Sequence, residues 1–163
     1  MARATLWRIA TETRDYKAND LSGEGAAKKP GRWNADGEPV VYSALTIALA
    51  VLETAAHIDD SGLPQNKFIV EITVPPDVWR RRKSLKEKRL DPAWAAIPAG
   101  RASIDVGSSW VKSMSSALLL APSVVVKEEY AVLINPRHND AKGITAKTIR
   151  PFEYNKLFRT WTG

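Results

Sequence analysis

The hydrophobic pattern predicts a central strand and helix within residues 31–53, GRWNADGEPVVYSALTIALAVLE. Val40–Tyr42 is typical of a short strand, and the Ser43 hydroxyl could cap the helix that follows. From Leu45 to Ile58 almost every position is apolar, which is typical of a helix buried on most of its faces. Glu53 interrupts this run, and a buried carboxylate is costly unless something compensates it. Glu53 is therefore the most informative residue of the chain.

The sequence leaves two interpretations of Glu53 open. The carboxylate could point to solvent from a half-exposed helix, paired with His57 one turn later. It could instead line a ligand cavity and take part in chemistry. Arg32 and Tyr42 favour the cavity. An arginine in a non-helical segment can present its planar fork to phosphate, and a tyrosine offers a flat ring for stacking and a hydroxyl for bonding.

Alternation elsewhere predicts strands mixed with helices. Phe68–Val74 alternates apolar and polar residues and indicates a strand. Leu6–Ile9 indicates another strand, interrupted by Arg8, and the polar stretch Thr11–Pro30 indicates a long loop. The remaining expected elements are a surface connection at Leu90–Gly100, a helix from Ser103 to about Met114, and strands at Leu118–Leu120, Ser123–Val126, Tyr130–Ile134 and Ile144–Phe152. This order predicts a mixed α/β fold of the α+β type in a single domain, residues 1–163.

The composition excludes several classes of function. The 163 residues include no cysteine, which removes disulfides and thiolate chemistry. The two histidines are too few for a typical zinc site without cysteine, so no metal site is expected. The sequence shows neither a signal peptide nor an apolar run long enough to span a membrane. We therefore expect a cytoplasmic protein without membrane contact.

The net charge of +6 comes from one stretch of the chain. Arg80–Arg89 holds seven basic residues and one acidic residue, so the rest of the chain balances 17 basic against 17 acidic residues. Such a stretch is more often a solvated face. It could also form a nucleic-acid-binding surface, and a basic nucleic-acid-binding module is therefore kept as an alternative function.

Several short motifs, in this order and spacing, resemble the RES domain family, the toxins of RES–Xre toxin–antitoxin pairs. The motifs are Trp7-Arg8-Ile9, Ser22-Gly23 with Gly25-Ala26, Gly31-Arg32-Trp33-Asn34, Val41-Tyr42, Leu52-Glu53 with His57, Ala121-Pro122-Ser123, and Ile134-Asn135-Pro136 with His138. The ordered set is specific although no single motif is. The chain departs from the family at its end, where Tyr154-Asn155-Lys156-Leu157 replaces a common Asp-Pro-Arg-Leu-like sequence.

The resemblance implies a compact β core with surrounding helices, similar to the ADP-ribosyltransferase toxins, and a cleft for NAD as substrate, with no further cofactor. It implies a toxin that cleaves the nicotinamide–ribose bond by hydrolysis or phosphorolysis and depletes cellular NAD. ADP-ribosylation of a protein target is the alternative within the family. A cognate Xre-type antitoxin is the expected partner, with nucleic acid contacted only through it. Whether the chain forms a homo-oligomer in that complex is left open.

The resemblance also implies roles for individual residues. Glu53 would stabilise the oxocarbenium-like centre, Arg32 would clamp the diphosphate, and Tyr42 would stack on nicotinamide or ribose. Arg8 is a second candidate for the phosphates. Ser123 matches the family's serine and would bond the substrate.

The resemblance to the RES family leaves the roles of three further residues open. Asn135 could touch the cleft or only form a turn with Pro136. Ser115 and Ser116 compete with Ser123 for the position of the family's serine.

Overall fold

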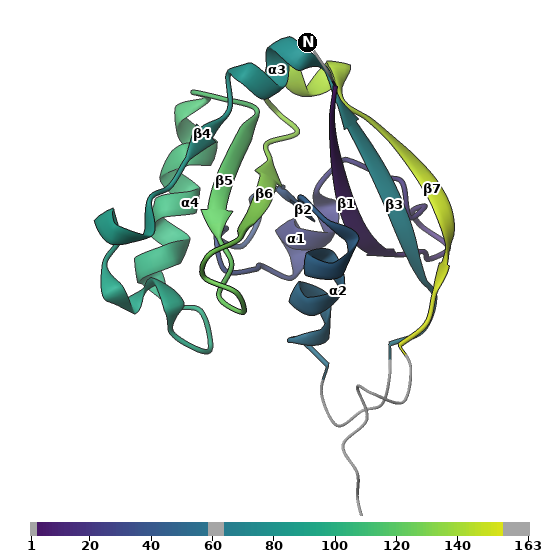
Figure 1. The fold of residues 1–163 in the computed structure, drawn as a ribbon, viewed down its shortest axis with the longest axis horizontal. Helices are drawn as coiled ribbons and strands as arrows, with labels where there is room; N and C mark the ends of the chain where they lie inside the picture. The colour runs from purple at the N-terminus through teal and green to yellow at the C-terminus, as the bar shows by residue number, and fades with distance from the viewer. Residues whose placement is uncertain (1–2, 59–63, 155–163) are drawn as a thin grey trace, which may run out of the picture.

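A seven-stranded sheet is the centre of the fold in the computed structural model, which describes residues 3–58 and 64–154 (Figure 1). The strand order is β4-β5-β6-β2-β1-β3-β7. All neighbouring strands are antiparallel except β4 and β5. The strands are β1 (Ala4–Thr11), β2 (Val41–Ala44), β3 (Lys67–Val74), β4 (Lys83–Ser84), β5 (Leu118–Pro122), β6 (Tyr130–Ile134) and β7 (Thr145–Phe152).

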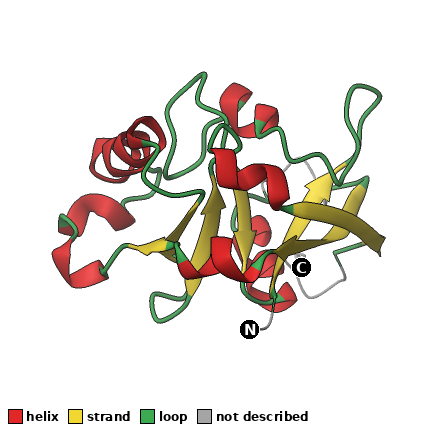
Figure 2. Cartoon of the chain, turned by 90° about the horizontal axis from the view of Figure 1, so that it is seen from above, coloured by secondary structure: helices red, strands yellow, loops and turns green. Residues whose placement is uncertain are grey.

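Helices surround this sheet and confirm the predicted mixed α/β class. The α-helices in the described residues are α1 (Glu24–Lys28), α2 (Ile47–Ala55), α3 (Pro76–Arg80) and α4 (Arg101–Ser113). Short 3₁₀ turns occupy Glu87–Arg89, Pro92–Ala95 and Asn139–Gly143. Figure 2 shows the strands in two groups with helices around them.

The two groups of strands meet at one residue pair. β3 pairs with β1 along the full length of both strands, and β7 pairs with the other edge of β3. In the second group, β6 lies between β5 and β2. The register that joins the groups contains the single pair Trp7↔Ala44 between β1 and β2. The β1–β2 ladder is therefore much shorter than the β1–β3 ladder beside it.

The core explains where the two longer helices lie. Leu49 and Ala50 of α2 pack with Ile9 and Ile69, so this helix covers the β1–β3 group. Trp110 and Val111 of α4 join a different cluster with Leu119, Ala121 and Leu133, so α4 covers the β5–β6 group. Alternate residues of the strands form a third cluster, which includes Val70, Ile72 and Val74 as the alternation predicts.

The start and the burial of α2 differ from the prediction. Thr46 caps the helix, because its Oγ1 accepts a hydrogen bond from Leu49 N at 3.1 Å. Ser43 instead lies in β2 and donates to Val132 O at 2.8 Å. Only one face of α2 packs on the sheet, so Ile47 and Leu52 remain exposed. The expectation of burial on most faces is therefore wrong.

Two other predicted elements are also wrong. Ser123–Val126 is a turn between β5 and β6, because the Ser123 hydroxyl accepts from the amides of Val125 and Val126 at 3.1 Å each. Trp94 is buried rather than part of a surface connection. It stacks on Trp33, which is also buried, with ring centroids 5.8 Å apart.

Smaller differences concern the helices. The loop predicted at Thr11–Pro30 contains α1. Helix α4 begins after Gly100, with Ser103 inside it, and the exposed Met114 adopts a left-handed conformation just beyond its end. The sequence also predicts a turn at the polar stretch Asp59–Asn66, which lies partly outside the described residues. The tail from 155 onward lies entirely outside them.

Candidate functional site

A cleft of about 740 Å³ lies between the two groups of strands. Residues far apart in the sequence line it: Trp7–Ile9 of β1, Tyr42–Ala44 of β2, Glu53 of α2, and the segments 29–33 and 97–99. The cleft lies where β1 and β2 share one paired position, Trp7↔Ala44, and both of these residues line it. A cleft lined by several elements, partly apolar and with a few polar groups, is typical of a ligand site.

Glu53 presents an unpaired carboxylate oxygen in this cleft. Its Oε1 atom is buried and has no hydrogen-bond partner in the part of the chain that the structure describes. The residue follows Leu49 and Ala50 by one helical turn and therefore shares their inward face. Its expected ion pair with the exposed His57 is not found among the described residues. This arrangement favours the cavity over the solvent-facing interpretation, since an unpaired buried carboxylate oxygen is costly without a ligand.

Arg32 faces Glu53 and also fastens a wall of the cleft. Its Nη1 atom donates to Trp94 O at 2.8 Å and to Ala96 O at 2.7 Å. Burial lowers the pKa of Arg32, whereas the charge of Glu53 raises it. One nitrogen of the guanidinium thus holds the segment before Ile97, and the predicted phosphate clamp would use its other nitrogens.

Tyr42 lines the cleft, and its hydroxyl is hydrogen-bonded to neighbouring residues. The hydroxyl donates to Asn34 Oδ1 at 2.6 Å and accepts from Trp33 N at 3.0 Å. Burial is the main cause that raises the pKa of Tyr42. The hydroxyl therefore stays protonated at neutral pH and fixes the ring, which is left to contact a ligand.

Asn34 organises this side of the cleft and was not singled out as a site residue from the sequence. It is fully buried, and its amide donates to the carbonyl oxygens of Ala26, Ala35 and Glu38. Its Oδ1 also accepts from Gly31 N at 2.8 Å. The signal available in the sequence was its place directly after Arg32 and Trp33, in a segment rich in turn formers.

Arg8 and Lys67 border the cleft from the other side. Both residues line the cleft and also a second cavity of about 180 Å³. Arg8 was proposed from the sequence, whereas Lys67 was missed because a lysine at the start of a strand is usually solvated.

Comparison with protein families matches residues 5–155 to the RES domain. The chain belongs to the RES family. This RES domain is 50% identical over 151 residues to a protein of Sphingobium sp. (strain YBL2) named Prs ADP-ribosylating toxin, covering 93% of this chain and 94% of that protein. It is 35% identical over 133 residues to a protein of Yersinia enterocolitica named Toxin Res, covering 82% and 84% of the two chains.

A solved structure supports the fold of this RES domain. The crystal structure of the M. tuberculosis MbcT–MbcA toxin–antitoxin complex contains a chain that superposes with a TM-score of 0.61 at 16% identity. The match covers 96% of this chain and 87% of that one. At this identity the comparison establishes a common fold.

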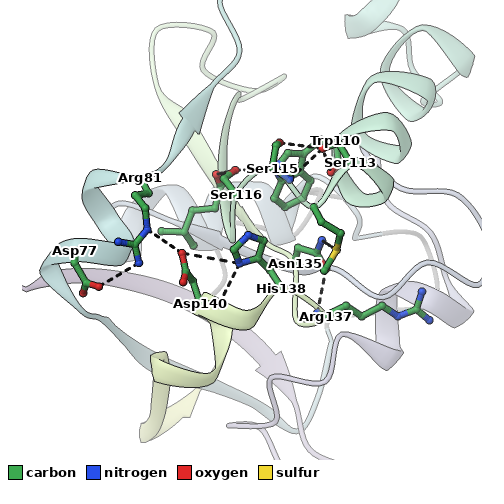
Figure 3. Close-up of polar contacts among 12 residues, drawn as sticks. Asp77, Arg81, Trp110, Ser113, Ser115, Ser116, Asn135, Arg137, His138 and Asp140 are labelled. Atoms are coloured by element: carbon green, nitrogen blue, oxygen red, sulfur yellow. Dashed lines mark hydrogen bonds and ion pairs between the residues drawn. The ribbon is translucent and has the colours of Figure 1, made fainter.

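Two residues predicted for the site do not line the cleft of this RES domain. The Ser123 hydroxyl is held in the β5–β6 turn described above, although its neighbours Pro122 and Val124 line the cleft. Asn135 is buried near α4, where its Nδ2 donates to Val111 O at 3.1 Å and its Oδ1 accepts from Arg137 N (Figure 3). Their roles toward a ligand remain predictions.

The two serines that compete with Ser123 lie in the same region as Asn135. Ser116 accepts from the Trp110 ring nitrogen at 3.0 Å, and Ser115 bonds to Ser113 (Figure 3). Neither lines the cleft in the described residues.

The basic stretch of the RES domain lies on the surface away from the cleft lining. All seven basic residues of Arg80–Arg89 are exposed, as expected for a solvated face. Arg81 is paired with Asp77 at 3.1 Å and with Asp140 at 3.0 Å (Figure 3). Arg82 lies over the Trp79 ring at 4.3 Å. In the described residues, no helix has both the length and the apolar character needed to cross a membrane.

Arg32→Lys is expected to weaken NAD binding by about tenfold, because lysine keeps the charge but loses the planar fork. The loss of the bonds to Trp94 and Ala96 should lower stability by about 1 kcal/mol. Calorimetric titration with NAD and a thermal melt measure both effects. Arg101→Lys is the control, because its side chain is 92% exposed. Unchanged NAD affinity in Arg32→Lys would exclude the predicted role of Arg32 in binding the diphosphate.

Proposed function

We propose that this RES domain is a toxin that breaks the nicotinamide–ribose bond of NAD and transfers the ADP-ribose to a protein. The observation that carries the proposal is the unpaired Oε1 of Glu53 inside a cleft of about 740 Å³. Protein ADP-ribosylation is favoured over hydrolysis because a relative of 50% identity is named an ADP-ribosylating toxin.

The chemistry needs one anion beside the reacting carbon. Nicotinamide leaves with the electron pair of its bond to ribose C1′ and needs no proton, since it is a cation before cleavage and neutral after it. Positive charge then develops on C1′ and the ring oxygen, as in glycoside cleavage. The Glu53 carboxylate would stabilise that charge and accept a bond from a ribose hydroxyl. A nucleophile of the acceptor bonds to C1′ and releases its proton.

Arg32 and Tyr42 would orient the substrate. The Arg32 guanidinium supplies charge opposite Glu53 and holds the segment that precedes Ile97, which lines the cleft. The Tyr42 ring, fixed by Asn34, offers a stacking face for nicotinamide or ribose. Hydrolysis and phosphorolysis use the same bond cleavage, so depletion of NAD remains the second candidate function and differs only in the acceptor.

The acceptor can be assigned with NAD labelled in its adenine ring. Purified protein is incubated with a cell extract, and the label is followed in protein, in free ADP-ribose and in ADP-ribose phosphate. The proposal predicts label on a discrete protein band that Glu53→Gln does not produce. Label found only in free ADP-ribose or its phosphate would assign the second candidate instead.

A cognate antitoxin, which we propose to be of the Xre type, is expected to block this activity. The solved structure of the same fold is a toxin–antitoxin complex, and an enzyme that consumes NAD would harm its own cell. We expect the two proteins to co-purify. If the antitoxin covers the cleft, the complex should release nicotinamide at less than about a tenth of the rate of the free chain. Rates for free chain and complex at equal concentration measure this. A complex as active as the free chain would show that the antitoxin does not block the cleft.

A further inference from the structure

The second cavity, of about 180 Å³, adjoins the cleft and shares three lining residues with it. The shared residues are Arg8, Ile9 and Lys67. The other walls come from the end of β1 and from residues 16–25. A ligand in the cleft could therefore reach Arg8 and Lys67 without entering the smaller cavity completely.

Two basic side chains meet at this junction. Lys67 is half-buried at the start of β3, and its Nζ donates to Thr11 Oγ1 at 2.6 Å. No carboxylate of the described residues forms an ion pair with Arg8 or Lys67. Burial lowers the pKa of both residues, and the charge of Arg8 lowers that of Lys67 further. Two desolvated cations that disfavour each other are stabilised when an anion binds between them.

The acidic residues of the second cavity cancel only part of its positive charge. Its lining contains Arg8, Lys17 and Lys67 against Asp20 and Glu24, which leaves one net positive charge. Asp20 raises the pKa of Arg8, but its carboxylate accepts hydrogen bonds from the Ser22 amide and hydroxyl at 3.0 and 2.7 Å and forms no ion pair with Arg8. The junction of Arg8 and Lys67 therefore fits an anionic group.

We propose that Lys67, together with Arg8, forms a phosphate-binding site where the cleft meets the second cavity. Arg32 alone is a weaker candidate for that task, because its Nη1 already holds two carbonyl oxygens. This inference rests on the proposed function, because the bound phosphate group takes part in the reaction with NAD. It comes either from the diphosphate of NAD or from inorganic phosphate acting as the acceptor. In the second case a phosphate oxygen bonds to ribose C1′ as nicotinamide leaves with its electron pair, and the phosphate loses one proton to solvent.

The test compares Lys67→Met, which keeps length and removes the charge, with Lys67→Arg, which keeps the charge. Lys147→Met is the control, because Lys147 is an exposed lysine of β7 in the same sheet. Binding of pyrophosphate and of inorganic phosphate is measured by calorimetry, which requires no turnover. KM and kcat are measured for NAD and for nicotinamide riboside, which carries no phosphate, each with and without added phosphate.

Lys67→Met is expected to weaken pyrophosphate or phosphate binding by about tenfold or more, with binding restored in Lys67→Arg and unchanged in Lys147→Met. If the site holds the diphosphate, KM for NAD rises by a similar factor and KM for nicotinamide riboside does not change. If it holds the acceptor, the stimulation of nicotinamide release by phosphate is lost instead.

Three results would overturn the inference. The first is wild-type affinity of Lys67→Met for both anions. The second is no binding of either anion by the wild type. The third is an equal loss for NAD and nicotinamide riboside without any loss of phosphate stimulation. If Lys67→Met does not fold, the wild type is tested by competition instead. The site is supported if pyrophosphate competes with NAD but not with nicotinamide riboside, or if phosphate stimulates nicotinamide release. The site is refuted if neither effect is observed. A wild type that binds pyrophosphate but never releases nicotinamide refutes the proposed function and leaves the phosphate site intact.

Discussion

Glu53→Gln is expected to lower the rate of nicotinamide release by a factor of about a hundred or more, as for loss of a preorganised electrostatic group. Glutamine keeps the volume of the side chain and deletes the negative charge, so the oxocarbenium-like centre loses its stabilising anion. NAD affinity should change much less, because the interaction is strongest in the transition state. Folding should survive or improve, because the substitution removes a negative charge whose Oε1 atom is buried without a hydrogen-bond partner among the described residues.

A thermal melt, an NAD titration and a rate on one preparation separate the possible roles of Glu53. A solvent-facing residue would give near-neutral changes in all three. A buried structural ion would lose stability when its charge is removed. Glu128→Gln is the control, because Glu128 is exposed in the β5–β6 turn. Full activity of a well-folded Glu53→Gln protein would exclude the catalytic role.

Gly107→Ala is expected to lower the free energy of unfolding by about 3 kcal/mol, at the upper end of the usual cost of overpacking. A Cβ atom at Gly107 of α4 would lie 1.7 Å from Trp33 O and 2.5 Å from Trp33 C. These are backbone atoms, so α4 or the segment that carries Arg32 must shift. The melting temperature should fall by roughly 6–12 °C for a chain of this size.

The control for Gly107 is Gly25→Ala in α1, where the added Cβ would meet no atom within 4 Å. That change should leave the melting temperature almost unaltered. Arg32 directly precedes Trp33, whose backbone the added Cβ would displace. Gly107→Ala should therefore also slow nicotinamide release in the fraction that stays folded. A Gly107→Ala protein as stable as the wild type would show that α4 does not pack on Trp33 as described.

Much of the fold was predictable because local patterns coincide with burial. The alternation in Phe68–Val74 matches the buried face of β3, and the apolar run after residue 45 contains α2. The sequence also predicted Arg32, Tyr42 and Glu53 as parts of one site, and the structure brings all three to one cleft. Their chemical roles remain predictions.

The errors arise where tertiary contacts override local preferences. Ser43 and Thr46 are both good caps, and pairing of Ser43 with β6 leaves Thr46 as the cap. Val124–Val126 resembles a strand, but the Ser123 hydroxyl closes a turn there. The tie from Arg32 to Trp94 and Ala96 spans about sixty residues, and no local pattern indicates it.

Lys67 illustrates a different limit. As a single lysine beside a predicted strand, it carries no motif. Its place in the linings of two cavities follows only from the pairing of β3 with β1, which sets Lys67 opposite Thr11. The phosphate site could therefore be inferred only once the sheet was known.

The central claim is that the cleft around Glu53 breaks the nicotinamide–ribose bond of NAD. The most direct measurement follows free nicotinamide and intact NAD by chromatography after incubation of the purified chain with NAD, beside Glu53→Gln at equal concentration. We expect one nicotinamide to form for each NAD lost in the wild type, and the rate to fall by about a hundredfold in the variant. Intact NAD with a folded wild type that binds it, or equal nicotinamide release by both proteins, would contradict the account.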